Sequence, residues 1–228
     1  MENIYSRTEL LVGKDNLNKI KNAHVCVFGV GGVGGYAVEC LARAGVGELT
    51  LIDFDTISVS NINRQLIALN SNVGKFKVDE YKTRIAEINP KIKVDAIKQK
   101  LTAENIGDFN LQSFNYVLDA IDDANAKLAL AKYSTENNIK IISAMGSGNR
   151  SGVPNFKVVD VFKTEGDGLA RKMRGLLKKA GVNKLDCVFS GEHANATESS
   201  VVASISYYPA AAGVVMAGFV INKIMEQN

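Results

Sequence analysis

The chain has 228 residues, of which 46% are hydrophobic and 22% charged, and its formal net charge is +3. These values suit one globular α/β domain with a sizeable core and exclude an intrinsically disordered chain. The weak positive charge permits an RNA partner without arguing for one, and three widely spaced cysteines without a CxxC pair exclude a disulfide framework and a structural zinc site.

Apolar periodicity divides the first part of the chain into alternating strands and helices. The predicted strands are short apolar runs at 25–30, 49–52, 92–97, 116–121 and 139–144. The predicted helices cover the second half of 1–23, with Leu10, Leu17 and Ile20 on one face, and then 34–44, 73–89, 102–107 and 124–137. This alternation predicts an α/β, Rossmann-like, doubly wound fold, with a mainly parallel sheet and helices on both faces.

The turn cluster MGSGNRSGVP at 145–154 introduces an additional C-terminal region. It is expected to separate an ATP-binding half, 1–144, from a substrate and dimer half, 145–228, within one domain. Residues 181–206 lack periodicity and are predicted to be a mobile loop or crossover. The other predicted elements are a strand at 156–162, a basic helix at 168–180 and a final helix from Pro209 that buries Ala210, Val214, Ala217, Ile221 and Ile224.

The sequence predicts a cytoplasmic location and no membrane partner. The N-terminal segment has no apolar core of signal-peptide length, and the apolar run 214–221 is too short to cross a bilayer. The cysteine usage fits the reducing cytosol.

Glycines placed between a strand and a helix give the clearest chemical signal. Gly29, Gly31 and Gly34 satisfy GxGxxG at the start of the helix 34–44. The exposed N–H groups and the positive end of the helix dipole there point at a phosphate. Asp53 ends the next strand, where a carboxylate can accept hydrogen bonds from ribose hydroxyls. The alternative is a tight turn without a ligand.

The residues after Asp53 favour a polyphosphate over a nicotinamide ring. The loop SNINRQ at 60–65 is dense in amide and guanidinium donors, and Lys77 would bring a second positive charge. Asp122 ends a further strand at the edge where ligands of open α/β sheets bind, and it is placed to hold a metal ion that bridges phosphates. Taken singly, Arg64 and Lys77 could be solvated charges and Asp122 a helix N-cap.

The chain resembles the superfamily of ubiquitin-activating-type (ThiF/MoeB-like) ATP-dependent adenylating enzymes, through the segments GVGGVGG, LIDFDTISVSNINRQ, VGKFK and LDAIDD. The resemblance implies ATP and Mg²⁺ as cofactors, with Arg64, Lys77 and Asp122 as catalytic residues and Asp122 as the metal ligand. It implies that the nucleotide is bound by Gly29, Gly31, Gly32, Gly34, Asp53, Asp55, Asn61, Arg64, Gln65, Lys77, Asp122 and Arg7.

Arg7 matches the N-terminal arginine that dimers of this superfamily insert into the ATP site of the neighbouring subunit. The resemblance therefore implies a homodimer. The alternative is that Arg7 is an ordinary surface arginine.

The second half of the chain resembles the tRNA threonylcarbamoyladenosine dehydratase branch, through DGLARKMRGLLKKAGVNKLDCVFSGE. This resemblance implies an enzyme that adenylates the threonylcarbamoyl carboxylate of tRNA and cyclises it, with release of AMP and pyrophosphate. The main alternative is an adenylyltransferase that activates the C-terminal Gly-Gly of a small ubiquitin-like sulfur carrier, with a sulfur-transfer or carrier protein as partner. Those activators usually carry two CxxC zinc pairs, which this chain lacks. A third possibility is a nucleotide-binding protein without catalysis.

Two further sets of residues are candidates. Cys187 could form a thioester if Lys184 and His193 lowered the pKa of its thiol, and the alternative is a buried, inert cysteine in a strand. The basic helix could contact tRNA phosphates, and the alternative is a solvated helix face. Its candidate residues are Arg171, Lys172, Arg174, Lys178 and Lys179.

Overall fold

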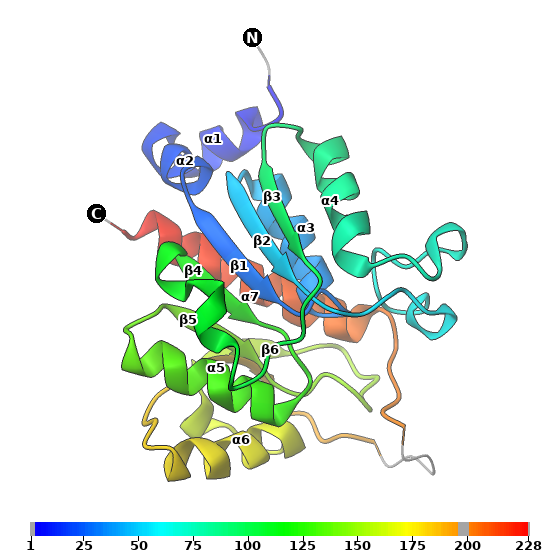
Figure 1. The fold of residues 1–228 in the computed structure, drawn as a ribbon, viewed down its shortest axis with the longest axis vertical. Helices are drawn as coiled ribbons and strands as arrows, with labels where there is room; N and C mark the ends of the chain where they lie inside the picture. The colour runs from blue at the N-terminus through cyan, green and yellow to red at the C-terminus, as the bar shows by residue number, and fades with distance from the viewer. Residues whose placement is uncertain (1–2, 196–200, 228) are drawn as a thin grey trace.

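A computed structural model describes residues 3–195 and 201–227, and its centre is a seven-stranded sheet (Figure 1). The strand order is β3-β2-β1-β4-β5-β7-β6, and every pair is parallel except β6 with β7. The predicted Rossmann-like fold is therefore confirmed. The strands are β1 (His24–Phe28), β2 (Glu48–Ile52), β3 (Lys93–Ile97), β4 (Tyr116–Asp119), β5 (Ile141–Ala144), β6 (Phe156–Asp160) and β7 (Asp186–Ser190).

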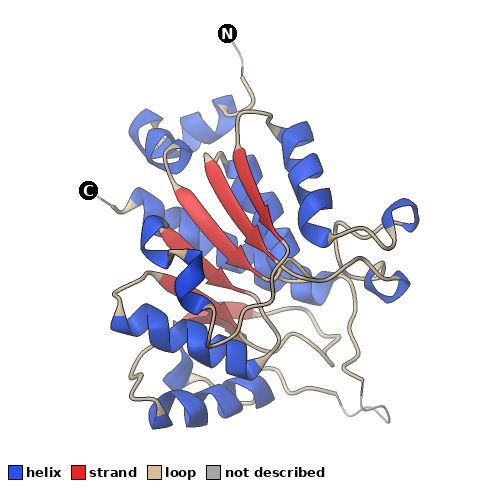
Figure 2. Cartoon of the chain, in the orientation of Figure 1, coloured by secondary structure: helices blue, strands red, loops and turns tan. Residues whose placement is uncertain are grey.

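Helices cover both faces of this sheet (Figure 2). The side chains of β1 point alternately to the two faces and are buried on both. Val25 and Val27 lie in the core that α3, α4 and α7 cover, and Cys26 and Phe28 lie in the core that α5 covers. The helices are α1 (Ser6–Val12), α2 (Lys14–Lys21), α3 (Gly34–Ala44), α4 (Lys77–Ile88), α5 (Ala124–Glu136), α6 (Gly168–Lys179) and α7 (Tyr207–Met225). Short 3-10 helices occur at Val59–Asn61, Asn70–Asn72, Ile106–Phe109, Leu111–Ser113 and Val161–Lys163.

The N-terminal prediction is wrong in one respect. Leu17 and Ile20 are buried on α2, but Leu10 lies on the separate helix α1 and is 87% exposed. Gly13, with φ of +83°, turns the chain between the two helices, so the three residues cannot share a face. The predicted helices at 73–89 and 102–107 are also displaced, to Lys77–Ile88 and to 3-10 turns that begin at Ile106.

The predicted loop 181–206 contains a strand that periodicity did not reveal. β7 lies between β5 and β6, and its residues Cys187, Val188 and Phe189 are all buried. A strand buried on both faces has no polar–apolar alternation, which explains the error. Residues 201–206 are held against the turn cluster, where the Ala203 N–H donates to Asn149 Oδ1 at 2.6 Å. Within this predicted loop, 196–200 lie outside the described residues.

The buried face of α7 also differs from the prediction. Of the five expected residues only Ala217 and Ile224 are buried, while Val214 is 50% exposed. The helix is apolar almost all round, so sequence alone could not fix which side packs inward. By length and composition α7 could cross a membrane, but its buried side packs against α3. Gly213 permits this approach, since a Cβ there would lie 2.2 Å from the Val33 carbonyl oxygen.

Candidate active site

The glycine loop joins β1 to α3 at the carboxyl edge of the sheet. Gly29 has φ of +81°, and its N–H donates to the Ile52 carbonyl at 2.8 Å. A Cβ on Gly34 would lie 1.8 Å from the Gly29 carbonyl oxygen, so no larger residue fits. No side chain caps α3 and its first turn holds no acid. The Gly35 and Ala37 N–H groups donate to the Gly31 and Val33 carbonyls, and the other N–H groups at this helix start are available to an anion.

Asp53 fastens this loop to the end of β2. Its Oδ2 accepts from the Val30 N–H and its Oδ1 from the Asp55 N–H, both at 2.8 Å. Burial raises the pKa of Asp53, and the positive charge of Lys77 opposes that shift. Each carboxylate oxygen keeps a further lone pair, which could accept from a ribose hydroxyl.

Lys77 is not a solvated charge. Its side chain is 5% exposed, and its ammonium lies 2.7 Å from Asp55 Oδ2. Lys77 is also the first residue of α4, four positions later than the sequence predicts the helix to start. The fold thus brings a buried positive charge to the same edge as the glycine loop, held there by the half-exposed Asp55.

The loop 58–65 presents Asn61, Arg64 and Gln65 in different settings. Asn61 is buried and its Oδ1 accepts from the Ser58 N–H, whereas Arg64 is half-buried and donates to the Ser60 carbonyl at 2.7 Å. Gln65 is buried, and its Oε1 has no hydrogen-bond partner among the described residues. A Cβ on Gly31 would lie 3.6 Å from its Nε2. This orphaned polar atom beside the glycine loop fits a bound hydroxyl or phosphate group.

Asp122 lies just beyond β4 and is exposed. The N-cap of α5 is its neighbour Asp123, which accepts from the Asn125 and Ala126 N–H groups, so Asp122 does not have the N-cap role. Among the described residues no cluster of three metal-ligating side chains exists. One carboxylate at this edge still fits Mg²⁺, which is commonly held by one or two carboxylates together with phosphates and water.

Arg7 lies away from the other predicted site residues. Its neighbour Tyr5 accepts from the Asn89 side chain and packs against Gly45, at the amino edge of the sheet. The glycine loop lies at the carboxyl edge, about 16 Å away along a five-residue strand (Figure 1). Arg7 is exposed and does not reach the site of its own chain.

Cys187 is fully buried in β7, and burial raises the pKa of its thiol to about 12. This favours the inert cysteine over the thioester.

On α6, Arg171, Lys172, Lys178 and Lys179 are exposed, whereas the Arg174 guanidinium donates to the Thr164 carbonyl at 2.8 Å. Arg174 is therefore engaged within the fold, and four basic residues remain on the open face.

Sequence reasoning missed a buried ion pair that holds the turn cluster. Arg150 and Asp167 are both almost completely buried, with 3.1 Å between their charged atoms. Arg150 also donates to the carbonyls of Gly146 and Glu192, and Asp167 caps α6. An arginine within a glycine-rich turn was the available signal, but its partner lies seventeen positions away. The pair fixes the loops that follow β5 and β7 at the edge that carries Asp122.

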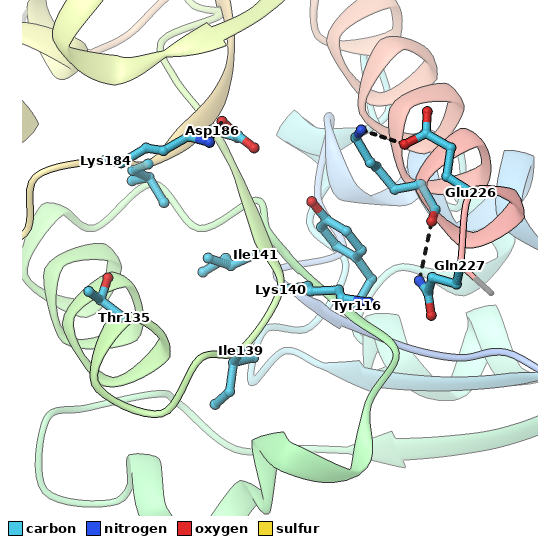
Figure 3. A pocket seen from close by; sticks show the side chains of 11 residues that line it. Tyr116, Thr135, Ile139, Lys140, Ile141, Lys184, Asp186, Glu226 and Gln227 are labelled. Carbon is cyan, nitrogen blue, oxygen red and sulfur yellow. Dashed lines mark hydrogen bonds and ion pairs between the residues drawn. The ribbon is translucent and has the colours of Figure 1, made fainter.

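A cavity of about 540 Å³ lies at the other edge of the sheet, where β4, β5 and β7 begin (Figure 3). Tyr116, Lys184 and Lys223 are among the residues that line it. None of the predicted site residues contributes to this cavity, so it is not a part of the candidate site.

Comparisons with known proteins agree with this geometry. Residues 5–228 match the ThiF family. The chain is similar to the tRNA threonylcarbamoyladenosine dehydratase of Bacillus subtilis (strain 168), with 38% identity over 240 residues that cover 97% of this chain and 94% of the relative. Among solved structures it resembles the E. coli tRNA N6-threonylcarbamoyladenosine dehydratase in complex with ATP, with a TM-score of 0.92, 36% identity and coverage of 97% and 93%. The AMP complex of that protein matches with a TM-score of 0.92 and 37% identity, covering 96% and 92%.

Proposed function

Because the chain belongs to the ThiF family, we propose that it is an ATP-dependent tRNA threonylcarbamoyladenosine dehydratase that works in the cytoplasm. One observation carries the proposal: the chain and its B. subtilis relative match over nearly their full lengths, the C-terminal part included. The glycine loop, the buried Lys77 and the half-buried Arg64 supply what an adenylating enzyme needs at one edge of one sheet.

The first step activates a poor electrophile. A carboxylate oxygen of the threonylcarbamoyl group attacks the α-phosphorus of ATP, and pyrophosphate leaves. Arg64 and Lys77 offset the negative charge that builds on the phosphates, and the N–H groups of the glycine loop orient them. Asp122 would hold Mg²⁺, which supplies Lewis-acid neutralisation of the phosphate oxygens.

The second step closes a ring. A nitrogen of the same nucleoside attacks the activated carbonyl carbon, and AMP departs with the bonding electrons. Holding this nitrogen beside the carbonyl accelerates the step without any protein nucleophile. The buried Cys187, whose pKa is raised to about 12, is consistent with a reaction that needs no thiol.

The assay that tests this function compares two substrates. We expect AMP release from ATP when tRNA that carries threonylcarbamoyladenosine is supplied, and none with a small sulfur carrier that ends in Gly-Gly. Release with the carrier alone would favour the sulfur-carrier adenylyltransferase, and no pyrophosphate exchange with either substrate would leave a nucleotide-binding protein.

We propose that Arg7 completes the ATP site of the second copy in a homodimer. Its distance from its own site supports this arrangement, as do the exposed Leu10 and Leu11 on α1, which would be buried by a partner. Arg7→Ala and Asp122→Ala proteins should each be inactive. After random subunit exchange, the equal mixture should recover about a quarter of the wild-type rate, because half of the dimers carry one intact site. An inactive mixture would place Arg7 outside the partner's site.

We propose that the exposed face of α6 binds the phosphate backbone of the tRNA. The charge of Lys172 acts on Asp123, so this helix flanks the carboxyl edge that carries Asp122. Lys178→Glu with Lys179→Glu should weaken tRNA binding and make the plot of log K against log salt shallower, by about one for each phosphate that is no longer neutralised. Lys91→Glu with Lys93→Glu, at the amino edge, reverses the same number of exposed charges and is the matched control. Equal affinity of both variants would remove α6 from the tRNA surface.

A further inference from the structure

We propose that Glu192 is the general base that removes the N–H proton of the nucleophilic nitrogen during ring closure. The inference rests on the proposed dehydratase function and assigns a residue to its second step. Glu192 follows β7, which runs parallel to β5. It therefore lies at the same edge of the sheet as Gly29 and Asp122.

A hydrogen bond ties the Glu192 carboxylate to the first turn of α7, and that turn packs against the glycine loop. The Tyr208 hydroxyl donates to Glu192 Oε2 at 2.8 Å, and Ser190 Oγ lies 3.0 Å from the same hydroxyl. Tyr208 is fully buried, and burial raises the pKa of its hydroxyl, which therefore remains a donor. The next residue, Pro209, packs against the glycine loop, with its Cβ 3.3 Å from where a Cβ on Gly32 would stand.

The backbone of Glu192 is fixed as well. Arg150 Nε donates to the Glu192 carbonyl at 2.9 Å, and the buried pair of Arg150 with Asp167 holds that guanidinium in place. A Cβ on Gly152 would lie 3.1 Å from Glu192 Oε2, so a glycine leaves room beside the carboxylate. Such double support is what holds a catalytic group in a productive geometry.

Other carboxylates at this edge of the sheet already form hydrogen bonds or ion pairs within the fold. Both oxygens of Asp53 accept backbone N–H groups, and Asp55 pairs with Lys77. Asp123 and Asp167 cap α5 and α6. Oε1 of Glu192, in contrast, has no hydrogen bond to any described residue. A carboxylate held by one oxygen and open at the other suits proton transfer.

The step balances. The nucleoside nitrogen forms a bond to the carbonyl carbon of the acyl-adenylate while its proton moves to the Glu192 carboxylate. The bond from that carbon to the phosphate oxygen breaks, and AMP leaves with the electron pair. Water then takes the proton from Glu192. The net result is the loss of one oxygen from the carboxylate to AMP, without any oxidant or reductant.

The two half-reactions can be measured separately to test this role. Glu192→Gln should retain tRNA-dependent exchange of pyrophosphate into ATP but slow formation of the cyclic nucleoside by about 10²- to 10⁴-fold. Glu192→Ala should behave alike, and added formate should restore its ring closure in part but not that of Glu192→Gln. Tyr208→Phe should slow ring closure less, because the base remains. Glu165→Gln, which removes the same charge from an exposed loop, is the matched control.

Ring closure at the wild-type rate in Glu192→Gln would overturn the assignment. Loss of both half-reactions together without formate rescue would also overturn it, because a base acts only after adenylation. If His193→Gln instead gave the selective loss, the exposed His193 would be the base. Failure of the proposed function looks different, since the unaltered protein would then show no tRNA-dependent pyrophosphate exchange at all.

Discussion

Replacing Asp122 with alanine is expected to lower tRNA-dependent pyrophosphate release by about 10²-fold or more without changing the thermal midpoint. Asp122 is exposed and forms no hydrogen bond or ion pair with any described residue, so its removal costs the fold little. The proposed role of the negatively charged Asp122 carboxylate is to hold the Mg²⁺ that neutralises the phosphates. Single-turnover pyrophosphate release at saturating ATP measures this effect, and thermal unfolding checks the fold.

Asp123→Ala is the matched control for Asp122→Ala. It removes the N-cap of α5 and should cost about 1 kcal/mol of stability while the folded protein keeps its rate. The Ala126 N–H lowers the pKa of Asp123. The stability from this cap is thus present at neutral pH and is lost as the pH falls through the lowered pKa. A near-normal rate in Asp122→Ala, or an equal loss in both variants, would refute the role of Asp122.

Arg64→Ala is expected to slow adenylation by about 10²- to 10³-fold, again with the fold intact. Arg64 is half-buried, and its guanidinium donates only to the Ser60 carbonyl and the Asn63 side chain of its own loop. Its planar fork matches two phosphate oxygens at once. Arg64→Lys keeps the charge and loses the fork, so it should recover only part of the rate.

The effect of Arg64→Ala should fall on the first half-reaction. Pyrophosphate release measured in a single turnover should slow as much as AMP release in steady-state turnover. Arg43→Ala, which removes an exposed arginine paired with Glu39 on α3, is the control and should leave the release of pyrophosphate and AMP unchanged. Full pyrophosphate release with Arg64→Ala would mean that this arginine does not serve the phosphates.

The glycine loop and α3 could be predicted because they depend on residues that are adjacent in the sequence. The glycine loop needs only the strand before it and the helix after it, and α3 spans the residues that periodicity predicts, up to the αL residue Gly45. The mainly parallel sheet with helices on both faces follows from alternating strands and helices with right-handed crossovers. The likeness of 51–65 to a known motif indicated Asp55, Asn61, Arg64 and Gln65 as further nucleotide residues.

Features that depend on distant contacts could not be predicted. Glu192 acquires its position from Tyr208, sixteen residues later, and from Arg150, forty-two residues earlier. The strand β7 is buried on both faces and therefore carries no alternation. The sequence predicts Lys77 as a second positive charge for the phosphates, with a solvated charge as the alternative, but it does not predict the burial of Lys77, which depends on the approach of Asp55.

An isotope experiment tests the central claim most directly, namely that a tRNA carboxylate is activated on the α-phosphorus of ATP. The enzyme is given ATP and tRNA whose threonylcarbamoyl carboxylate carries ¹⁸O, and the released nucleotide is analysed by mass spectrometry. The account predicts AMP that carries one ¹⁸O atom in its phosphate, with unlabelled pyrophosphate. Unlabelled AMP, or ADP together with ¹⁸O-labelled inorganic phosphate, would contradict it.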